Sequence, residues 1–220
     1  MSRLIAALAL ACSLIALLPA AASAEVWHAD DPSGDVTGFE YSIDPEPCGT
    51  AGDLGSYDRP EIDLTGVEVR HDEQVVRVVL GIADARRGRK AAFWIALRTP
   101  DGDYSLDVQN RRVRGTWGVR TFLAHQPEPP NAEDLDECGG YWVMQEDVRC
   151  PVSASVDTWA DRITVELPRR CLGSPRWVRA AVSSYRWQRL DDRSFITMSD
   201  QASRAPGFSP RIRPRDGRVR

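Results

Sequence analysis

The 220-residue sequence contains no segment in which apolar residues recur with the 3.6-residue period of an amphipathic helix. Apolar and polar residues instead alternate over short stretches, and turn residues interrupt them about every 8 to 12 positions. This pattern excludes a helical bundle and predicts roughly nine to eleven short strands. We therefore predict an all-β fold: an antiparallel β-sandwich or barrel that forms one domain.

Common catalytic motifs are also absent. There is no Gly-x-Ser-x-Gly, no His-Glu-x-x-His and no phosphate-binding P-loop. The three histidines, His28, His71 and His125, fall at a predicted strand end, in a turn and in a loop. We therefore predict a non-enzymatic protein. A secreted hydrolase is the last of three functions considered below. It stays open because two carboxylates distant in sequence can meet in a fold and hydrolyse a glycoside.

Lysine is nearly absent, since Lys90 is the only one among 28 basic residues. Arginine is concentrated at the C-terminus: residues 169–220 hold 13 Arg against 4 Asp, whereas residues 25–84 hold 15 Asp and Glu against 3 Arg. No aromatic residues are interleaved with the basic ones in a nucleic-acid-binding pattern, so we predict no nucleic-acid partner. Residues 203–220, rich in Arg, Pro and Gly, predict a disordered tail.

The one long apolar run is too short to span a membrane. It covers residues 4–18, follows Arg3 and precedes Ala22-Ser23-Ala24, a small-x-small cleavage site. A spanning helix needs about 20 apolar residues. Residues 1–24 therefore predict a secretory signal peptide, after which the secreted chain begins at Glu25, carries one domain over residues 25–202 and has no membrane span.

Four cysteines remain after Cys12 leaves with the signal peptide: Cys48, Cys138, Cys150 and Cys171. An even number in an exported chain predicts two disulfides, for which three pairings exist. Cys150 and Cys171 flank a predicted hairpin with strands near 152–156 and 162–167, at the open end of one ladder. This favours Cys150–Cys171 and, by elimination, Cys48–Cys138. A zinc site is disfavoured because no two cysteines are separated by two residues.

The clearest local pattern lies in residues 58–82. Its apolar residues alternate along a first strand, switch parity at Thr65-Gly66 and alternate again after the polar turn at residues 71–73. The parity switch predicts a β-bulge. Residues 37–60, which contain four glycines and three prolines, predict a long loop.

An acidic turn at residues 30–36 precedes this hairpin and predicts a cation site. Asp31 and Asp35, brought together by a tight turn at Gly34, and Asp63 at the strand start are the predicted calcium ligands, with Asp30 and Asp53 as reserves. The alternative is that these carboxylates only cap backbone amides in turns.

Seven tryptophans are available to stack on a ligand. Trp94 and Trp177 fall within apolar strands and are expected in the core. Four others lie near turns or polar residues, and among them Trp117 and Trp142 are the predicted ligand-binding residues. The alternative for each is a core or loop-anchoring role.

Two stretches carry a resemblance to known proteins. Asp31-Pro32-x-Gly34-Asp35, followed by Asp63-Leu64-x-x-Val67-x-Val69 and Val76-x-Val78, resembles the opening of β-sandwiches like carbohydrate-binding module family 9 and of DOMON-like domains. Residues 167–179 resemble a segment of uncharacterised secreted actinobacterial proteins with that opening.

The resemblance implies a jelly-roll-like sandwich, a structural calcium ion in several relatives and sugar rings stacked on tryptophan in some. We therefore predict a secreted module that binds carbohydrate or a cell-surface polymer. The alternative is a structural or protein-interaction domain of the cell envelope, whose arginine tail contacts anionic wall polymers.

Overall fold

The computed structural model describes residues 25–42, 50–87, 91–113, 116–126, 145–202 and 207–214, without the side chains of residues 87, 111–113, 116 and 117. These residues form two antiparallel sheets with two short 3-10 helices, η1 (Ala85–Arg87) and η3 (Arg169–Leu172), and no α-helix. None of the helices in the described ranges is long and apolar enough to cross a membrane. The all-β prediction is confirmed, whereas the jelly-roll-like single sandwich stays a prediction.

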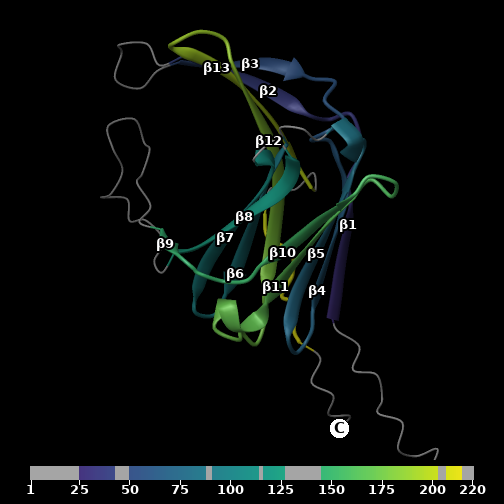
Figure 1. Cartoon of the computed structure of the whole chain (residues 1–220), viewed down its shortest axis with the longest axis vertical. Helices are drawn as coiled ribbons and strands as arrows, with labels where there is room; N and C mark the ends of the chain where they lie inside the picture. The colour runs from purple at the N-terminus through teal and green to yellow at the C-terminus, as the bar shows by residue number, and fades with distance from the viewer. Residues whose placement is uncertain are drawn as a thin grey trace, which may run out of the picture.

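The smaller sheet has five strands. Its spatial order is β1 (Glu25–Asp30), β4 (Leu64–His71), β5 (Val75–Ile82), β11 (Arg162–Pro168) and β10 (Ser153–Asp157). Neighbouring strands pair antiparallel throughout. Figure 1 shows this sheet on the right of the molecule, with β1 at its outer edge.

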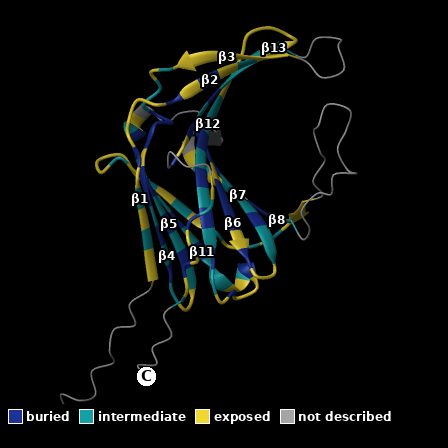
Figure 2. Cartoon of the chain, turned by 180° about the vertical axis from the view of Figure 1, so that it is seen from behind, coloured by how far each residue is buried: buried dark blue, intermediate teal, exposed yellow. Residues whose placement is uncertain are grey.

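The larger sheet has eight strands. Its spatial order is β3 (Thr50–Ser56), β2 (Thr37–Ser42), β13 (Ser194–Gln201), β12 (Arg179–Arg189), β6 (Ala92–Thr99), β7 (Gly102–Val113), β8 (Thr116–Gln126) and β9 (Glu146–Asp147). This sheet curves strongly, so that β2, β3 and β13 arch over the upper end of the molecule and its hollow side faces away from the smaller sheet (Figures 1 and 2).

One apolar core lies between the inner faces of the two sheets. In β6, Phe93, Ile95 and Leu97 point into it, and in β5 Val76, Val78 and Leu80 do so from the other side. This alternation follows from the two-residue period of a strand. Figure 2 shows the buried residues gathered between the sheets, while β3 is exposed along its whole length.

The hairpin predicted within residues 58–82 is β4 and β5. The register between the two strands shifts between Leu64 and Gly66, which confirms the bulge predicted from the parity switch. A Cβ on Gly81 would lie 2.6 Å from the Thr65 hydroxyl oxygen, so a larger side chain there would clash with the bulge. The sequence pattern was sufficient here because both strands of the hairpin are adjacent in the chain.

The long loop predicted over residues 37–60 is wrong for most of its length. Residues 37–42 and 50–56 pair as the β2–β3 hairpin, and β2 also pairs with β13. Phe39 and Tyr41 alternate with Gly38 and Glu40, a strand pattern that the surrounding glycines and prolines obscured. Pro45, within the loop prediction, lies outside the described residues.

The Cys150–Cys171 disulfide is confirmed, with the two Cα atoms 6.0 Å apart. It joins the start of the β10–β11 hairpin to η3 at the open end of that ladder, as the hairpin reasoning predicted. Cys48 and Cys138 lie outside the described residues, so their pairing stays a prediction.

The C-terminal segment is not a disordered tail over its whole length. Residues 207–214, here called the C-terminal strap, run along the first part of β12 beyond the end of β13. Val178 and Ile212 exchange two backbone hydrogen bonds of 2.8 and 2.9 Å, and Ile212 is buried in the core. The strap is ordered because it satisfies backbone groups of β12 that β13 does not reach. Composition alone does not show this.

His71 fastens the strap from the smaller sheet. Its side chain is fully buried, and Nδ1 lies 3.0 Å from the carbonyl oxygen of Ile212, so Nδ1–H is the donor. Nε2 is buried without a hydrogen-bond partner among the described residues. Burial lowers the pKa of His71 and the charge of Arg169 adds to this, while the hydrogen bond to Ile212 and the carboxylates of Asp72 and Glu25 oppose it.

His71 should therefore make the fold less stable in acid. Its folded-state pKa lies below the ordinary 6.5, so the unfolded chain takes up the proton first. The contribution of neutral His71 to the stability of the fold is complete above pH 6.5. It is lost as the pH falls towards the folded-state pKa. Thermal unfolding of wild type and His71→Asn, compared at neutral pH and at about pH 5, should show a smaller loss in the variant. Equal losses would contradict this role.

Candidate functional site

Carboxylates from distant parts of the chain meet at one end of the two sheets. Asp31 and Asp35 belong to the turn between β1 and β2, and Asp200 belongs to β13. Each of the three has a carboxylate oxygen within 4.8 Å of the others. Asp31 and Asp200 are buried, whereas Asp35 is exposed. Together with Asp63, they are called the acidic cluster below.

Asp63 joins the cluster through the turn. Its Oδ2 accepts the backbone N–H of Gly34 at 2.8 Å, and Gly34 has a φ of 90°, which glycine adopts without steric strain. Asp63 is only 5% exposed, and its Oδ1 is buried with no hydrogen-bond partner among the described residues. A buried carboxylate oxygen without a donor is costly. A bound cation would remove that cost.

Asp200 holds the two sheets together at the cluster. Its Oδ2 accepts the backbone N–H of Leu64, the first residue of β4, at 2.7 Å, and its Oδ1 accepts that of Gln201. Burial, together with the charges of Asp35 and Asp63, raises the pKa of Asp200 to about 6, against the opposing effect of these hydrogen bonds. The carboxyl therefore holds a proton more tightly than an exposed aspartate does.

Burial likewise raises the pKa of Asp63, and the nearby carboxylates of Asp35 and Asp58 add to this. The Gly34 N–H acts in the opposite direction. Negative charge crowded into a partly buried space can be neutralised by protons or by a metal ion. Oxygen ligands of this kind suit a hard cation such as calcium.

The sequence prediction thus identified part of the cluster. Asp31 and Asp35 meet as expected, and Asp63 contacts their turn, although its role as a ligand stays a prediction. The reserves lie apart from these contacts: Asp30 is exposed and pairs with His28, and Asp53 accepts the Gly55 N–H in β3.

Asp200 was missed because it lies 165 positions after Asp35 in the sequence. A signal for it exists in the pattern of β13. Met198 and Asp200 share the inward face of that strand, so a carboxylate follows a buried methionine at a core-facing position.

A second feature lies on the outer face of the larger sheet, its hollow side. Cross-strand register places several partly or largely exposed aromatic side chains there: Phe39, Tyr41, Trp94, Phe122, Tyr185, Trp187 and Phe195. Trp94 is 47% exposed, so the expectation that it lies in the core is wrong. Exposed aromatics gathered on one face make that face a candidate recognition surface.

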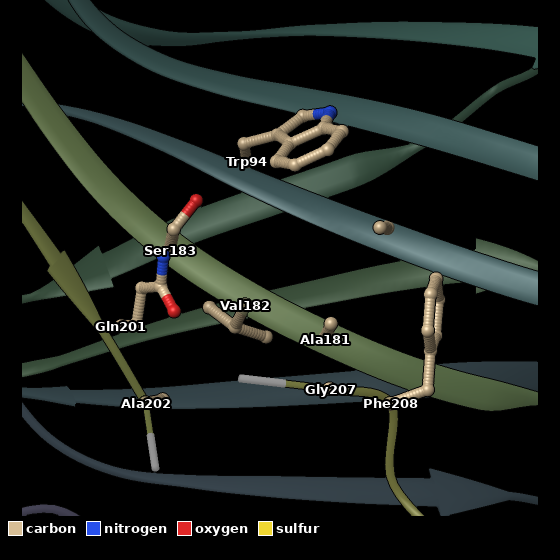
Figure 3. Close-up of a pocket in the computed structure, with 9 residues that line it drawn as sticks. Trp94, Ala181, Val182, Ser183, Gln201, Ala202, Gly207 and Phe208 are labelled. Carbon is tan, nitrogen blue, oxygen red and sulfur yellow. The ribbon is translucent and has the colours of Figure 1, made fainter. Parts of the chain in front are cut away.

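Trp94 forms one wall of a hollow of about 210 Å³ on this face. Phe208 of the C-terminal strap also lines the hollow, and Figure 3 shows Ala181 beside its ring, with Trp94 above both. Ala181 lies opposite Ala96 in the β6–β12 pair, so the floor consists of small side chains. This hollow is called the aromatic slot below. It is smaller than the pockets that hold drug-sized ligands, which occupy about 300 Å³ or more.

Polar groups line one end of the aromatic slot. Ser183 pairs with Trp94 across β6 and β12, and Gln201 pairs with Ser183 across β12 and β13. Figure 3 shows Ser183 and Gln201 at the end of the slot away from Phe208. A hydroxyl and an amide both donate and accept hydrogen bonds. The slot therefore combines two aromatic walls with uncharged polar groups.

Two arginines of the larger sheet hold Phe208 in place. Arg98 and Arg179 lie 4.4 and 5.8 Å from the centre of the Phe208 ring, and Arg179 also donates to the carbonyl oxygens of Phe208 and Ser209. Arg98 is fixed in turn by two-pronged hydrogen bonding to Asp103. These contacts fix the position of Phe208 beside the slot.

The tryptophans predicted to bind a ligand are not those of the slot. Trp117 belongs to β8, but its side chain lies outside the described residues, as does the whole of Trp142. Trp177 is half-buried beneath the guanidinium of Arg211, 4.8 Å from its ring centre.

In protein kept free of metal by a chelator, we expect Asp200 to lower the unfolding midpoint as the pH rises. Its folded-state pKa of about 6 lies above the ordinary 3.8, so the folded state holds the proton more tightly. This stabilisation is complete below pH 3.8 and is lost as the pH rises through 6. Asp200→Asn should reduce the decline in unfolding midpoint across that range. An unchanged decline would show that Asp200 does not titrate there.

No protein-family model matches the sequence, and no curated protein or solved structure matches the chain.

Proposed function

We propose that this chain is a secreted, non-enzymatic β-sandwich module that binds neutral carbohydrate on the outer face of its larger sheet. The observation that carries the proposal is the aromatic slot, which Trp94 and Phe208 line together with small side chains. The acidic cluster is proposed to hold a structural calcium ion.

The slot suits a sugar ring for a physical reason. The axial C–H bonds of a pyranose form a flat apolar surface that packs on an aromatic ring, while its hydroxyls point outward along the rim. Ser183 and Gln201 lie where such hydroxyls need partners. A small floor of alanines leaves room for the ring itself.

The charge of the slot favours a neutral sugar over an anionic polymer. Its two nearest arginines, Arg98 and Arg179, are engaged with Asp103 and with carbonyl oxygens of the strap. Neither belongs to the residues that line the slot. An anionic wall polymer would need cations aimed into the site.

A cation in the acidic cluster would also help to fix the strand that carries part of the aromatic slot. Asp200 points inward from β13, while its neighbour Gln201 lines the slot. Calcium takes six to eight oxygens, for which Asp31, Asp35 and Asp200 supply carboxylates, with Asp63 beside them. Fixing Asp200 would therefore fix the strand that carries Gln201.

The slot is tested by binding of the oxidised mature chain, residues 25–220, to an array of neutral and anionic glycans. Wild type should bind neutral glycans, and Trp94→Ala should weaken this about tenfold or more, because a buried aromatic contact contributes strongly. Trp159→Ala is the matched control, since Trp159 is 88% exposed in the β10–β11 turn of the other sheet.

Equal losses in Trp94→Ala and Trp159→Ala would contradict the slot. Preference for anionic glycans would contradict the neutral ligand. Binding only to other envelope proteins, with no glycan bound, would favour the protein-interaction alternative.

The cation is tested by thermal unfolding with calcium and with excess chelator. Calcium at about 100 times its dissociation constant should stabilise the fold by about 2.7 kcal/mol, a shift of roughly 5–10 °C for a domain of this size. Asp35→Asn and Asp200→Asn should abolish the shift, and Asp53→Asn, in an exposed carboxylate of β3, should retain it. No shift at millimolar calcium would leave the cluster as hydrogen-bonding carboxylates only.

A further inference from the structure

A second group of aromatic rings lies on the outer face, farther along β12. Trp187 is 68% exposed, and its ring centre lies 6.4 Å from that of Phe195 on β13. Phe195 lies 5.1 Å from Tyr41 on β2. These three residues, Tyr41, Trp187 and Phe195, are called the distal platform below. Their rings form a continuous apolar surface across three neighbouring strands.

The distal platform continues the surface of the aromatic slot. Trp187 follows Ser183 by four residues on β12, so both point to the outer face and lie about 13 Å apart along the strand. Tyr185 lies between them on the same face, with its ring centre 5.8 Å from that of Trp187. The side chains from the slot to the platform therefore all lie on the same face of the sheet.

The side chains beside this path carry hydroxyls rather than charges. Ser199 pairs with Tyr185, and Thr197 pairs with Trp187. On the next strand Thr37 pairs with Ser199 and Phe39 pairs with Thr197. Among the described neighbours of Tyr185 the carboxylate is Asp107, and its Oδ1 accepts the Tyr185 hydroxyl at 2.7 Å.

Charged side chains border the platform at two described places: the turn after β12, and strand β3, where the exposed Asp53 pairs with Phe39. Arg189 pairs with Phe195 across the β12–β13 ladder and forms an ion pair with Asp192 in the connecting turn. The outward residues of β12 and β13 between the slot and this turn are aromatic or hydroxyl-bearing: Tyr185, Trp187, Thr197 and Ser199. Charge complementarity accordingly selects an uncharged, hydroxyl-rich partner.

We propose that the distal platform is a second subsite of the same ligand, so that the protein binds a neutral polysaccharide chain lying along β12 rather than a single sugar. This inference rests on the proposed function of the aromatic slot. A chain that fills the slot with one sugar unit extends across Tyr185 and stacks a later unit on Trp187. The two subsites then act together through one covalent ligand.

The platform suits a sugar chain better than a protein surface. Protein interfaces combine an apolar centre with a charged and polar rim. Here the aromatic rings alternate with hydroxyls along the path, which matches a ligand whose every unit has an apolar face and a hydroxyl edge. A second copy of this chain, docked through Trp187 or through the exposed strand β3, is the competing occupant.

The test compares sugar hexamers with their monomers by titration calorimetry. The probes are cellohexaose, xylohexaose and mannohexaose, each beside glucose, xylose or mannose, with the mature chain as wild type, Trp187→Ala, Trp94→Ala and the control Trp159→Ala. For the sugar that binds, the hexamer should bind at least tenfold more tightly than the monomer. Trp187→Ala should remove about tenfold of hexamer affinity and leave monomer affinity within about twofold. Trp94→Ala should weaken both.

The outcomes separate this inference from the proposed function. Hexamers that bind no more tightly than monomers, with monomer binding still lost in Trp94→Ala, overturn the second subsite and leave the slot intact. Absence of binding by every probe overturns both. Hexamer affinity that Trp187→Ala does not change also overturns the platform.

Two further measurements exclude simpler explanations. Tyr41→Ala should weaken hexamer binding as Trp187→Ala does, and circular dichroism of both variants should match wild type. Sedimentation at increasing concentration should show a monomer. A dimer that dissociates in Trp187→Ala would overturn the proposal and assign the platform to self-association.

Discussion

A buried hydrogen bond joins the two sheets where the acidic cluster lies: the Asp200 carboxylate of β13 accepts the backbone N–H of Leu64 on β4 at 2.7 Å. Beside it, Asp63 accepts the N–H of Gly34 and thereby fixes the turn that carries Asp31 and Asp35. The Asp200 carboxylate is needed because the Leu64 N–H is buried, and buried backbone N–H groups are almost always paired. Burial, together with the charges of nearby carboxylates, raises the pKa of Asp63 and Asp200, so protons or a cation that neutralise these groups are favoured.

Strand β13 contributes side chains both to the acidic cluster and to the proposed ligand-binding face. Its inward side chains, Met198 and Asp200, belong to the core and the acidic cluster. Its outward side chains, Phe195 and Gln201, belong to the distal platform and the aromatic slot. The strap completes the arrangement, because it supplies Phe208 and is anchored to the smaller sheet through His71. A proposed calcium ion and a proposed sugar chain would thus stabilise opposite faces of one strand.

The sequence predicted what depends on neighbours in the chain. Alternation within residues 58–82 predicted the β4–β5 hairpin and its bulge, and the spacing of Cys150 and Cys171 about a hairpin predicted their disulfide. It could not predict contacts between distant segments, so Asp200 was missing from the cluster and Phe208 was assigned to a disordered tail. Trp94 was misplaced for another reason. Every residue from Ala91 to Leu97 is apolar, so alternation cannot show which side faces solvent.

The central claim is that the hollow outer face of the larger sheet binds a neutral sugar chain. The most direct measurement is a map of backbone amide chemical-shift changes when cellohexaose, xylohexaose or mannohexaose is added to the isotope-labelled mature chain. The account predicts changes that run along β12 from Ala181 to Trp187 and extend to β6 and β13, with little change at Trp159. Changes confined to the smaller sheet, or no change with any of the three, would contradict it.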